Sequence, residues 1–277
     1  MMQLHFQKRL AAAQGAMELE IQFELQTGQC LALFGPTGSG KTSILRMIAG
    51  LMHPDGGHLS WKGETWWGNA PKTNRPPQAR DCGMVFQNYA LFPHLTVQQN
   101  IAAGQGPTSD PKAVDELLQL MDLSQLAHQK PGQLSGGQQQ RTALARALAQ
   151  KASLLLLDEP LAAQDQATRQ QLQQQLRQWL KETQTTTILV SHDSQEVKAL
   201  ADRVLILEQG RVTADGLPAE IFPTASQSQG EYQVMALQHH LEGWVTTLKS
   251  ATQTLQWTTA QRPNWQIGDI IQLNTAS

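Results

Sequence analysis

The chain has 277 residues with a formal net charge of −2 at pH 7, and 40% of its residues are hydrophobic while 16% are charged. This composition argues against a disordered chain, and the near-neutral charge argues against a protein that binds nucleic acid through bulk positive charge. The length allows one large domain and a small one. The N-terminal MMQLHFQKRL lacks the apolar stretch of a signal peptide, and no apolar run approaches the roughly 18 residues that span a bilayer.

The first half of the chain alternates strand patterns with turns and one helix. Residues 17–25 alternate in period two, which predicts a half-buried strand with one apolar face formed by Met17, Leu19, Ile21, Phe23 and Leu25. Residues 30–34 are continuously apolar and predict a buried strand, followed by a glycine-rich turn and a helix that ends near Gly50. HPDGGHLSWKGE predicts a turn and hairpin, and residues 83–87 predict another short strand.

The second half contains most of the predicted helices. Residues 88–148 alternate turns with helical patterns, of which VDELLQLMDL is the clearest. SLLLLDEP predicts a buried strand, and residues 167–182 predict an amphipathic helix whose apolar face carries Leu172, Leu176, Trp179 and Leu180. TTILVSHD and RVLILEQGRV add further strands, so we expect a mostly parallel α/β sheet.

The composition of the sequence changes after Pro223. TASQSQGEYQ is small and polar, which predicts a linker. WVTTL, TLQWTT and GDIIQLN then predict three short strands, and hence a small β appendage. The two cysteines, Cys30 and Cys82, lie in apolar runs and are predicted to be reduced core residues, as in a reducing cytosol.

GPTGSGKT, at residues 35–42, lies between a predicted buried strand and a predicted helix. This is the context of a phosphate-binding P-loop, in which glycines let backbone N–H groups turn toward phosphate oxygens. Lys41 can reach the β- and γ-phosphates of a nucleotide, and the Thr42 hydroxyl can bind Mg²⁺. The motif therefore predicts a nucleotide site.

Asp158 and Glu159 follow four consecutive leucines at the end of a predicted buried strand. Two carboxylates at such an edge need a cation or a chemical role, because water reaches them poorly. We expect Asp158 to face Mg²⁺ through water and Glu159 to polarise a water that attacks phosphate.

A second glycine pair, in LSGGQQQR at residues 134–141, opens another predicted helix. With this motif, the order P-loop, Gln87, LSGGQ, LLLLDE and His192 resembles the ATP-binding cassette (ABC) ATPase subunits of transporters over about residues 1–225. The resemblance implies an α/β P-loop NTPase fold with a RecA-like core and a helical subdomain at about 88–148. Residues 226–277 would form a small β-rich accessory segment that resembles part of a MOP/TOBE-like domain.

The resemblance also assigns roles to individual residues. ATP and Mg²⁺ would be the ligands, and the P-loop residues that hold ATP would be Gly35, Pro36, Thr37, Gly38, Ser39, Gly40, Lys41, Thr42 and Ser43. The ATP of a second copy, in a head-to-tail dimer, would be held by Ser135, Gly136, Gly137 and Gln138. Catalysis would use Glu159, His192 and Gln87, and the metal would be held by Thr42, Gln87 and Asp158.

Two segments depart from the family pattern. The family often carries an aromatic residue before the P-loop that stacks on adenine, whereas KRLAAAQGA has none. Leu10 or a neighbouring alanine is then the expected apolar contact, and the preference for ATP over GTP stays open. The segment after the catalytic glutamate usually reads close to SALD but here reads AAQD at residues 162–165, which keeps Asp165 and lacks the serine hydroxyl.

The resemblance implies the ATPase subunit of an importer, peripheral on the cytoplasmic face of the cell membrane. Its partners would be a second copy, integral membrane permease subunits and, indirectly, a solute-binding protein, with no nucleic acid. NYALFPHLTVQQNI resembles the surface that receives a coupling helix of the permease.

The cargo is predicted less directly. QCLALFGPTGSGKTS, RPPQAR, LADRVLILEQGRV and the absent adenine aromatic favour molybdate or a related oxyanion. The alternatives are the ATPase of a sulfate, iron or polyamine importer, a soluble ABC ATPase outside transport, or a regulatory cassette. For the C-terminal appendage, a structural dimerisation element and an oxyanion sensor both stay open.

Overall fold

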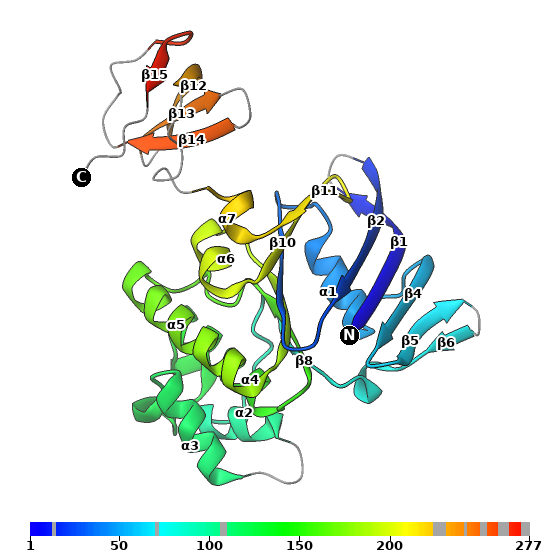
Figure 1. Ribbon diagram of the computed structural model, residues 1–277. Helices are drawn as coiled ribbons and strands as arrows, with labels where there is room; N and C mark the ends of the chain where they lie inside the picture. Colours follow the sequence, from blue (N-terminus) through cyan, green and yellow to red (C-terminus); the bar gives the residue numbers. More distant parts are fainter. Residues whose placement is uncertain are drawn as a thin grey trace. The chain divides into compact units, whose positions relative to one another are not determined.

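The computed structural model describes residues 1–12, 15–69, 72–105, 110–223, 231–240, 243–249, 254–259 and 266–272. The chain divides into two compact units, Met1–Ile221 and Phe222–Ser277, each of which is described by itself (Figure 1).

A six-stranded sheet with the order β11-β10-β3-β9-β8-β7 forms the centre of the first unit. Its strands are β3 (Cys30–Phe34), β7 (Cys82–Val85), β8 (Leu154–Asp158), β9 (Thr186–Val190), β10 (Arg203–Glu208) and β11 (Arg211–Gly216). Every neighbouring pair is parallel except β10 and β11, so the predicted mostly parallel sheet is confirmed. The carboxyl ends of β3, β9, β8 and β7 consequently meet at one edge.

A separate antiparallel sheet with the order β2-β1-β4-β5-β6 was not predicted as such. Its strands are β1 (Met2–Ala12), β2 (Gly15–Leu25), β4 (Gly56–Trp61), β5 (Glu64–Asn69) and β6 (Lys72–Asn74). The predicted half-buried strand is β2, in which Leu19, Ile21, Phe23 and Leu25 are buried and Met17 is half-buried. The predicted hairpin is β4–β5. The strand β1 joins them, because it pairs with β2 on one side and β4 on the other.

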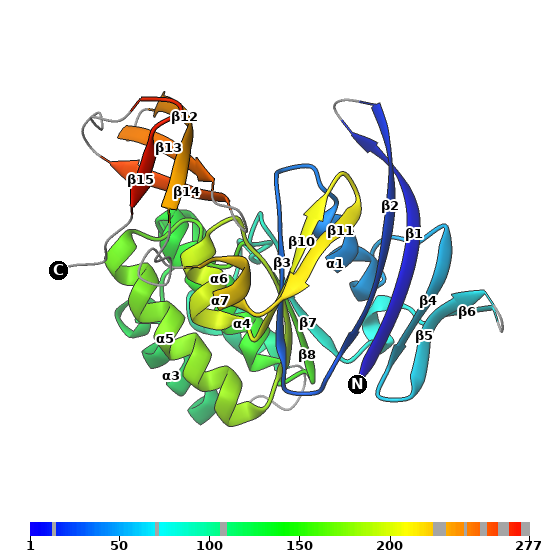
Figure 2. The ribbon, with the colours of Figure 1, turned by 45° about the horizontal axis from the view of Figure 1, so that its top comes forward.

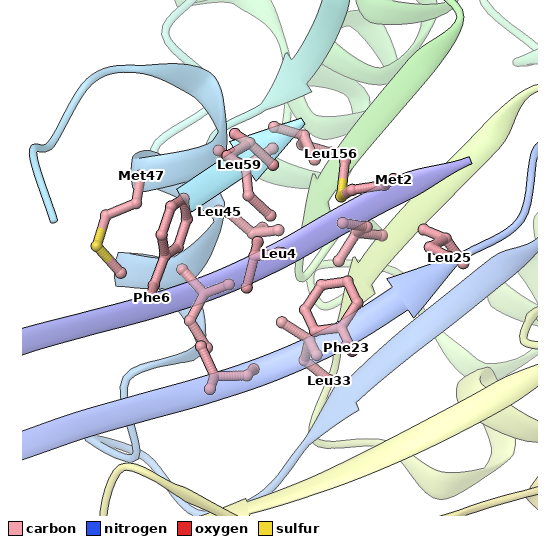
Figure 3. Close-up of a cluster of buried hydrophobic side chains, with 14 of the residues drawn as sticks. Met2, Leu4, Phe6, Phe23, Leu25, Leu33, Leu45, Met47, Leu59 and Leu156 are labelled. Carbon is pink, nitrogen blue, oxygen red and sulfur yellow. The ribbon is translucent and has the colours of Figure 1, made fainter. Parts of the chain in front are cut away.

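The main hydrophobic core lies between the two sheets and includes the P-loop helix α1 (Lys41–Ala49). Figure 3 shows side chains from β1, β2, β3, α1, β4 and β8 packed together. Met2 and Phe6 of β1 are fully buried here, against partners such as Leu33, Leu45 and Leu156. Burial of side chains this large stabilises the fold by roughly 2 kcal/mol each. This packing anchors the helix that carries Lys41.

The remaining helices of the first unit are α2 (Val97–Gly104), α3 (Pro111–Leu120), α4 (Gly136–Ala149), α5 (Gln166–Thr183), α6 (Ser194–Leu200) and α7 (Pro218–Ile221), with 3-10 turns η1 (Pro77–Ala79), η2 (Ser124–Leu126) and η3 (Pro131–Gln133). Figures 1 and 2 show α5 and α6 on one side of the six-stranded sheet and α1 on the other. The clearest predicted helix, α3, starts earlier than the apolar pattern suggested, because Asp110 caps it by accepting from the Lys112 N–H. Among the described residues, no helix is long and apolar enough to cross a membrane.

The second unit contains a four-stranded antiparallel sheet with the order β14-β13-β12-β15. Its strands are β12 (Glu231–His240), β13 (Gly243–Lys249), β14 (Thr254–Thr259) and β15 (Ile270–Gln272). The three predicted strand patterns correspond to β13, β14 and β15, whereas β12 was not predicted. Most of the predicted linker, residues 224–230, lies outside the described residues, and β12 begins within its last three positions.

Both cysteines are free, as predicted, with Cys30 buried and Cys82 half-buried. Burial raises the pKa of the Cys30 thiol to about 12 and that of the Cys82 thiol to about 11. Both side chains therefore stay protonated and unreactive at neutral pH.

A buried arginine closes the end of the P-loop helix. The Arg80 guanidinium, 5% exposed, donates to the carbonyls of Met47 at 2.8 Å, Ile48 at 2.6 Å and Arg75 at 2.9 Å. Two of these are last-turn carbonyls of α1, which lack partners within the helix. The Arg80 side chain thus acts as a cap for the helix that positions Lys41.

We expect Arg80→Met to lower the free energy of unfolding by about 2–3 kcal/mol, since the Ile48 and Arg75 carbonyls lose the Arg80 donor, whereas the Met47 carbonyl keeps the Gly50 N–H at 3.1 Å. Chemical denaturation measures this change. Arg75→Met is the matched control, because Arg75 pairs with Glu64 at the surface and its loss should cost less than about 0.5 kcal/mol. Equal losses in the two variants would refute the capping role of Arg80.

Candidate functional site

Four loops meet where the parallel strands of the six-stranded sheet end. The P-loop follows β3, Gln87 follows β7, Glu159 follows β8 and His192 follows β9. All four contribute to one cavity of about 540 Å³, whose lining also includes Thr37, Gly38, Gly40, Lys41, Thr42 and Ser43. The carboxyl ends of parallel strands lie at the same edge of a sheet, and this brings residues that are about 150 positions apart in the sequence to one cavity.

The P-loop surrounds the Lys41 ammonium. Lys41 Nζ donates to the carbonyls of Gly35 and Pro36, each at 2.7 Å, and lies 3.4 Å from Ser39 Oγ. Gly40, with φ of 101°, turns the chain into α1 in a backbone conformation that favours glycine. Burial lowers the pKa of Lys41, and the carboxylates of Glu159 and Asp158 oppose that shift. The loop thus holds a cation at a helix start, which suits a phosphate group.

Two of the three residues predicted to hold Mg²⁺, Thr42 and Asp158, are in direct contact. Thr42 Oγ1 donates to Asp158 Oδ1 at 3.1 Å, across the gap between α1 and β8. Burial raises the pKa of the Asp158 carboxyl, while the Thr42 hydroxyl opposes that rise. Within the described part of the chain, no group of three or more His, Cys, Asp or Glu side chains is arranged to hold a metal ion. The hydroxyl and carboxylate fit a hard cation such as Mg²⁺, which takes its other oxygen ligands from waters and phosphates. Gln87 lines the P-loop cavity together with Thr42, and it also lines a second cavity together with Asp158.

Glu159 and His192 face each other at the cavity. Glu159 Oε1 lies 3.1 Å from His192 Nδ1. The Glu159 backbone has φ of 51°, and its N–H donates to the Val190 carbonyl at 2.9 Å. This bond ties the end of β8 to the end of β9, so the left-handed turn fixes the carboxylate beside the histidine. Such an uncommon backbone conformation is often found at functional positions.

The LSGGQ segment opens α4 and lies outside the lining of that cavity. Ser135 caps the helix: its Oγ accepts from the Gln138 N–H at 3.3 Å, and the Gln138 side chain accepts from the Ser135 N–H at 2.8 Å. Both side chains predicted to cradle phosphate therefore serve the cap within their own chain. The first N–H groups of the helix, at Gly136 and Gly137, have no partner in a preceding turn and can bind an anion.

Apolar side chains also line the P-loop cavity. They belong to Leu10 and Ala11 of β1, Met17 of β2 and Met52. The residues expected to give an apolar contact in place of a stacking aromatic, Leu10 and a neighbouring alanine, are thus part of the cavity lining. A wall of aliphatic side chains and thioethers offers a base no hydrogen-bond donor or acceptor in those side chains beyond weakly accepting sulfur.

Three buried polar residues near the site were not predicted from sequence: Gln140, Gln164 and Glu196. Gln140 and Gln164 could have been found from the sequence, because Gln140 lies just after LSGGQ and Gln164 lies just after the pair Asp158 and Glu159. Glu196 lies four residues after His192, in the first turn of α6, where its polarity suggests solvent exposure. It is 3% exposed, and its Oε2 accepts from the Ser191 hydroxyl at 2.5 Å.

Burial raises the pKa of Glu196 to about 7, and the side chains that act on it are Ser191, through a hydrogen bond, and Asp193, Arg169 and His192, through electrostatic interactions. Between its unfolded pKa, near 4.5, and about 7, the folded chain keeps a proton that the unfolded chain releases. The free energy of unfolding therefore falls as pH rises through this window. We expect Glu196→Gln to be as stable as the parent at pH 4.5 and more stable at pH 8, by roughly 1–3 kcal/mol.

Denaturant unfolding at the two pH values tests this expectation. Glu182→Gln, at an exposed position of α5, is the control and should follow the parent at both. A Glu196→Gln chain with the same pH dependence as the parent would show that Glu196 ionises normally in the folded state.

A sequence profile described as "ABC transporter" matches residues 19–162. The chain therefore belongs to the ABC transporter family, and its first unit has the α/β P-loop fold of ABC ATPases, as predicted. It is 46% identical over 209 residues to the sulfate/thiosulfate import ATP-binding protein CysA 2 of Agrobacterium fabrum, covering 73% of this chain and 60% of that one. It is 44% identical over 209 residues to the spermidine/putrescine import ATP-binding protein PotA of Thermobifida fusca, covering 74% and 53%. The chain thus spans less than two thirds of the length of these relatives.

Solved structures give the same fold. The dimeric post-hydrolysis state of the ATP-binding cassette MJ0796, bound to ADP and Pi, has a TM-score of 0.69 at 28% identity and covers 79% of this chain and 99% of that one. The structure of cbiO1 from Clostridium perfringens, part of the ABC transporter complex cbiONQ, has a TM-score of 0.66 at 25% identity, with 79% and 89% covered.

Proposed function

We propose that this chain is the ATP-hydrolysing subunit of an ABC importer. The observation that carries the proposal is the single cavity at the carboxyl edge of the sheet, where Lys41, Glu159, His192 and Gln87 meet. Membership of the family and similarity to two import ATP-binding proteins support it. We place the ATPase domain at residues 1–225, with a helical subdomain at about 88–148 that includes α2, α3 and α4.

The chemistry follows from the contacts of the site. On ATP binding, Lys41 exchanges the Gly35 and Pro36 carbonyls for the β- and γ-phosphates, and P-loop N–H groups bind phosphate oxygens. Thr42, Asp158 and Gln87 would hold Mg²⁺, which supplies positive charge to the phosphates as the γ-phosphoryl leaves. Glu159 accepts a hydrogen bond from the attacking water, and His192 holds that carboxylate and the γ-phosphate in line.

We propose that a second copy completes this site. Ser135, Gly136 and Gly137 lie outside the cavity of their own chain, and the free N–H groups at the start of α4 suit a phosphate. A head-to-tail dimer would bring the α4 start of one copy to the P-loop of the other. The solved cassette MJ0796, which is dimeric with ADP and Pi, supports the proposal of a dimer.

A second surface fits the coupling helix of an integral membrane permease. It is a cavity of about 330 Å³, with Leu51, Phe86, Phe92 and Arg146 in its lining. Leu51 is 50% exposed and Phe92 is 44% exposed, which is uncommon for large apolar side chains without a partner. The Arg146 guanidinium lies 5.2 Å from the Phe92 ring centre and donates to the carbonyl of Ala90 at 2.7 Å. Phe86 of this surface directly precedes Gln87 of the P-loop cavity, so a docked helix could act on the nucleotide site.

The cargo is proposed at the level of a class. We propose a tetrahedral oxyanion, because the sequence features favour molybdate and one relative imports sulfate/thiosulfate, which is chemically similar. Similarity to the spermidine/putrescine protein keeps a polyamine as the competing cargo. We further propose that the chain is peripheral on the cytoplasmic face of the membrane and that residues 226–277 form an accessory β segment, supported by the compact unit from Phe222 onward.

Reconstitution tests the proposal. The chain would be co-purified with its permease, and ATP turnover measured with the solute-binding protein loaded in turn with molybdate, tungstate, sulfate, thiosulfate, ferric iron or spermidine. Stimulation by an oxyanion is the expected result. Stimulation by iron or spermidine alone would overturn the cargo class and keep the importer. Turnover in a chain that associates with no membrane protein would favour a soluble ABC ATPase.

A further inference from the structure

A glutamine joins the two loops on which the proposed dimer depends. Gln164 is 7% exposed, and its Nε2 donates to the Gly137 carbonyl at 2.9 Å and to Gln140 Oε1 at 3.0 Å. Gly137 belongs to the LSGGQ segment, whereas Gln164 lies in the turn between Glu159 and α5. The Gln164 side chain therefore connects the proposed phosphate cradle, formed by Ser135 to Gly137, to the turn that follows Glu159.

Gln140 extends this connection toward the active site. It is 2% exposed; its Nε2 donates to the Glu159 carbonyl at 2.9 Å, and its Oε1 accepts from the Ala163 N–H at 3.0 Å. Buried amides rarely lack partners, and a satisfied network in a low dielectric holds its members in one arrangement. The start of α4 is thus hydrogen-bonded to both ends of the turn at 159–164.

Arg169 also holds the turn at 159–164 in place. Its guanidinium donates to the Gln164 carbonyl at 2.8 Å and to the Leu161 carbonyl at 3.3 Å, and it pairs with Asp193 at 3.2 Å. Asp193 is the neighbour of His192. The turn is therefore in contact, through Arg169, with the loop that carries His192, as well as with the LSGGQ segment.

The close approach of the turn depends on a glycine. A Cβ at Gly137 would lie 3.0 Å from the Ala163 carbonyl oxygen and 3.1 Å from Gln164 Oε1. The usual SALD pattern has leucine at the position of Gln164, and leucine could fill the same space but could donate neither bond. The two hydrogen bonds from Gln164 Nε2 to Gly137 and Gln140, here called the amide clasp, are therefore a property of this chain's own sequence.

We propose that Gln164 is a positioning residue that fastens the LSGGQ segment to the turn after Glu159, so that the two present to the second copy as one rigid unit. The proposal rests on the proposed function, because the cradle serves the ATP of the partner. It predicts a division of effects: Gln164 governs ATP-dependent association and leaves nucleotide binding at the chain's own P-loop unchanged.

The test uses Gln164→Leu, which keeps the volume, in the full chain carrying Glu159→Gln so that ATP is not consumed. ATP-dependent dimerisation is measured by analytical ultracentrifugation, and nucleotide affinity by titration at concentrations where the chain is monomeric. We expect dimerisation to weaken roughly five- to tenfold, the loss of about one buried hydrogen bond or slightly more, and monomer affinity to stay the same. Gln174→Leu, an exposed glutamine of α5, is the matched control and should change neither.

Amide hydrogen exchange of residues 134–142 in the nucleotide-free monomer provides a readout that needs no dimer. We expect at least threefold faster exchange in Gln164→Leu than in the control. Unchanged exchange, or unchanged dimerisation, would overturn the clasp and leave the proposed function intact. A Glu159→Gln chain that binds ATP but never dimerises would instead overturn the proposed dimer, while the exchange measurement would still decide the clasp.

Discussion

Glu159→Gln is expected to lower ATP turnover by about three orders of magnitude, the contribution typical of a positioned general base. The Glu159 carboxylate is held by a left-handed backbone turn at 3.1 Å from His192, and an amide at that position accepts a water proton poorly. The substitution keeps the volume and leaves Lys41, Thr42 and Asp158 in place. ATP should therefore still bind, and a dimer should accumulate because hydrolysis no longer separates the copies.

Phosphate release measures the turnover, and light scattering after gel filtration with ATP or ADP measures the dimer. Glu208→Gln, an exposed carboxylate at the end of β10, is the matched control and should behave as the parent. Parental turnover in Glu159→Gln would show that another group activates the water. Loss of ATP binding would show that Glu159 holds the nucleotide rather than acting on it.

Gly35→Ala is expected to lower the free energy of unfolding by about 3–5 kcal/mol, an exceptional loss for a single methyl group. A Cβ at Gly35 would lie 2.0 Å from the Leu207 carbonyl oxygen of β10, and the backbone there has φ of 148°. Neither atom can move cheaply, since Leu207 is buried and the preceding residue of β10 pairs with β3. The P-loop should shift as a result, so ATP binding should be lost together with stability.

Gly63→Ala is the control for backbone strain alone, since Gly63 also has a positive φ of 83° but open space around the added Cβ. We expect it to cost about 1 kcal/mol and to leave ATP binding unchanged. Thermal or denaturant unfolding and nucleotide titration measure both variants. If the two variants lost equal stability, the contact with Leu207 would not explain the need for glycine at position 35.

The strands that carry the site could be predicted because their sequences are unusual. Strand β3 and the first four residues of β8, Leu154 to Leu157, are apolar at every position, and a sequence of that kind suits only a strand covered on both faces. Once these strands are placed, the P-loop and the two carboxylates must lie at their carboxyl ends. The meeting of Lys41 with Glu159 and His192 follows from the parallel arrangement rather than from any local signal.

The antiparallel sheet and the amide clasp could not be predicted in the same way. In β1, Met2, Leu4 and Phe6 alternate with polar residues, but the pattern is short and its burial depends on pairing with β2 and β4. In sequence, Gln140 and Gln164 look no different from the many exposed glutamines of α5. Only the tertiary approach of the turn after Glu159 to Gly137 makes them core residues.

If the P-loop of one copy works with the LSGGQ segment of another, two inactive variants should restore each other's activity when they are mixed. Lys41→Ala removes the phosphate-binding cation and keeps the α4 start, whereas Ser135→Arg blocks the α4 start and keeps the P-loop. Each variant alone has no intact composite site, but a mixed dimer has one. Mixing is expected to restore ATP turnover, with a maximum near equal amounts of the two variants. Turnover in the mixture no higher than the sum of the separate variants would contradict it.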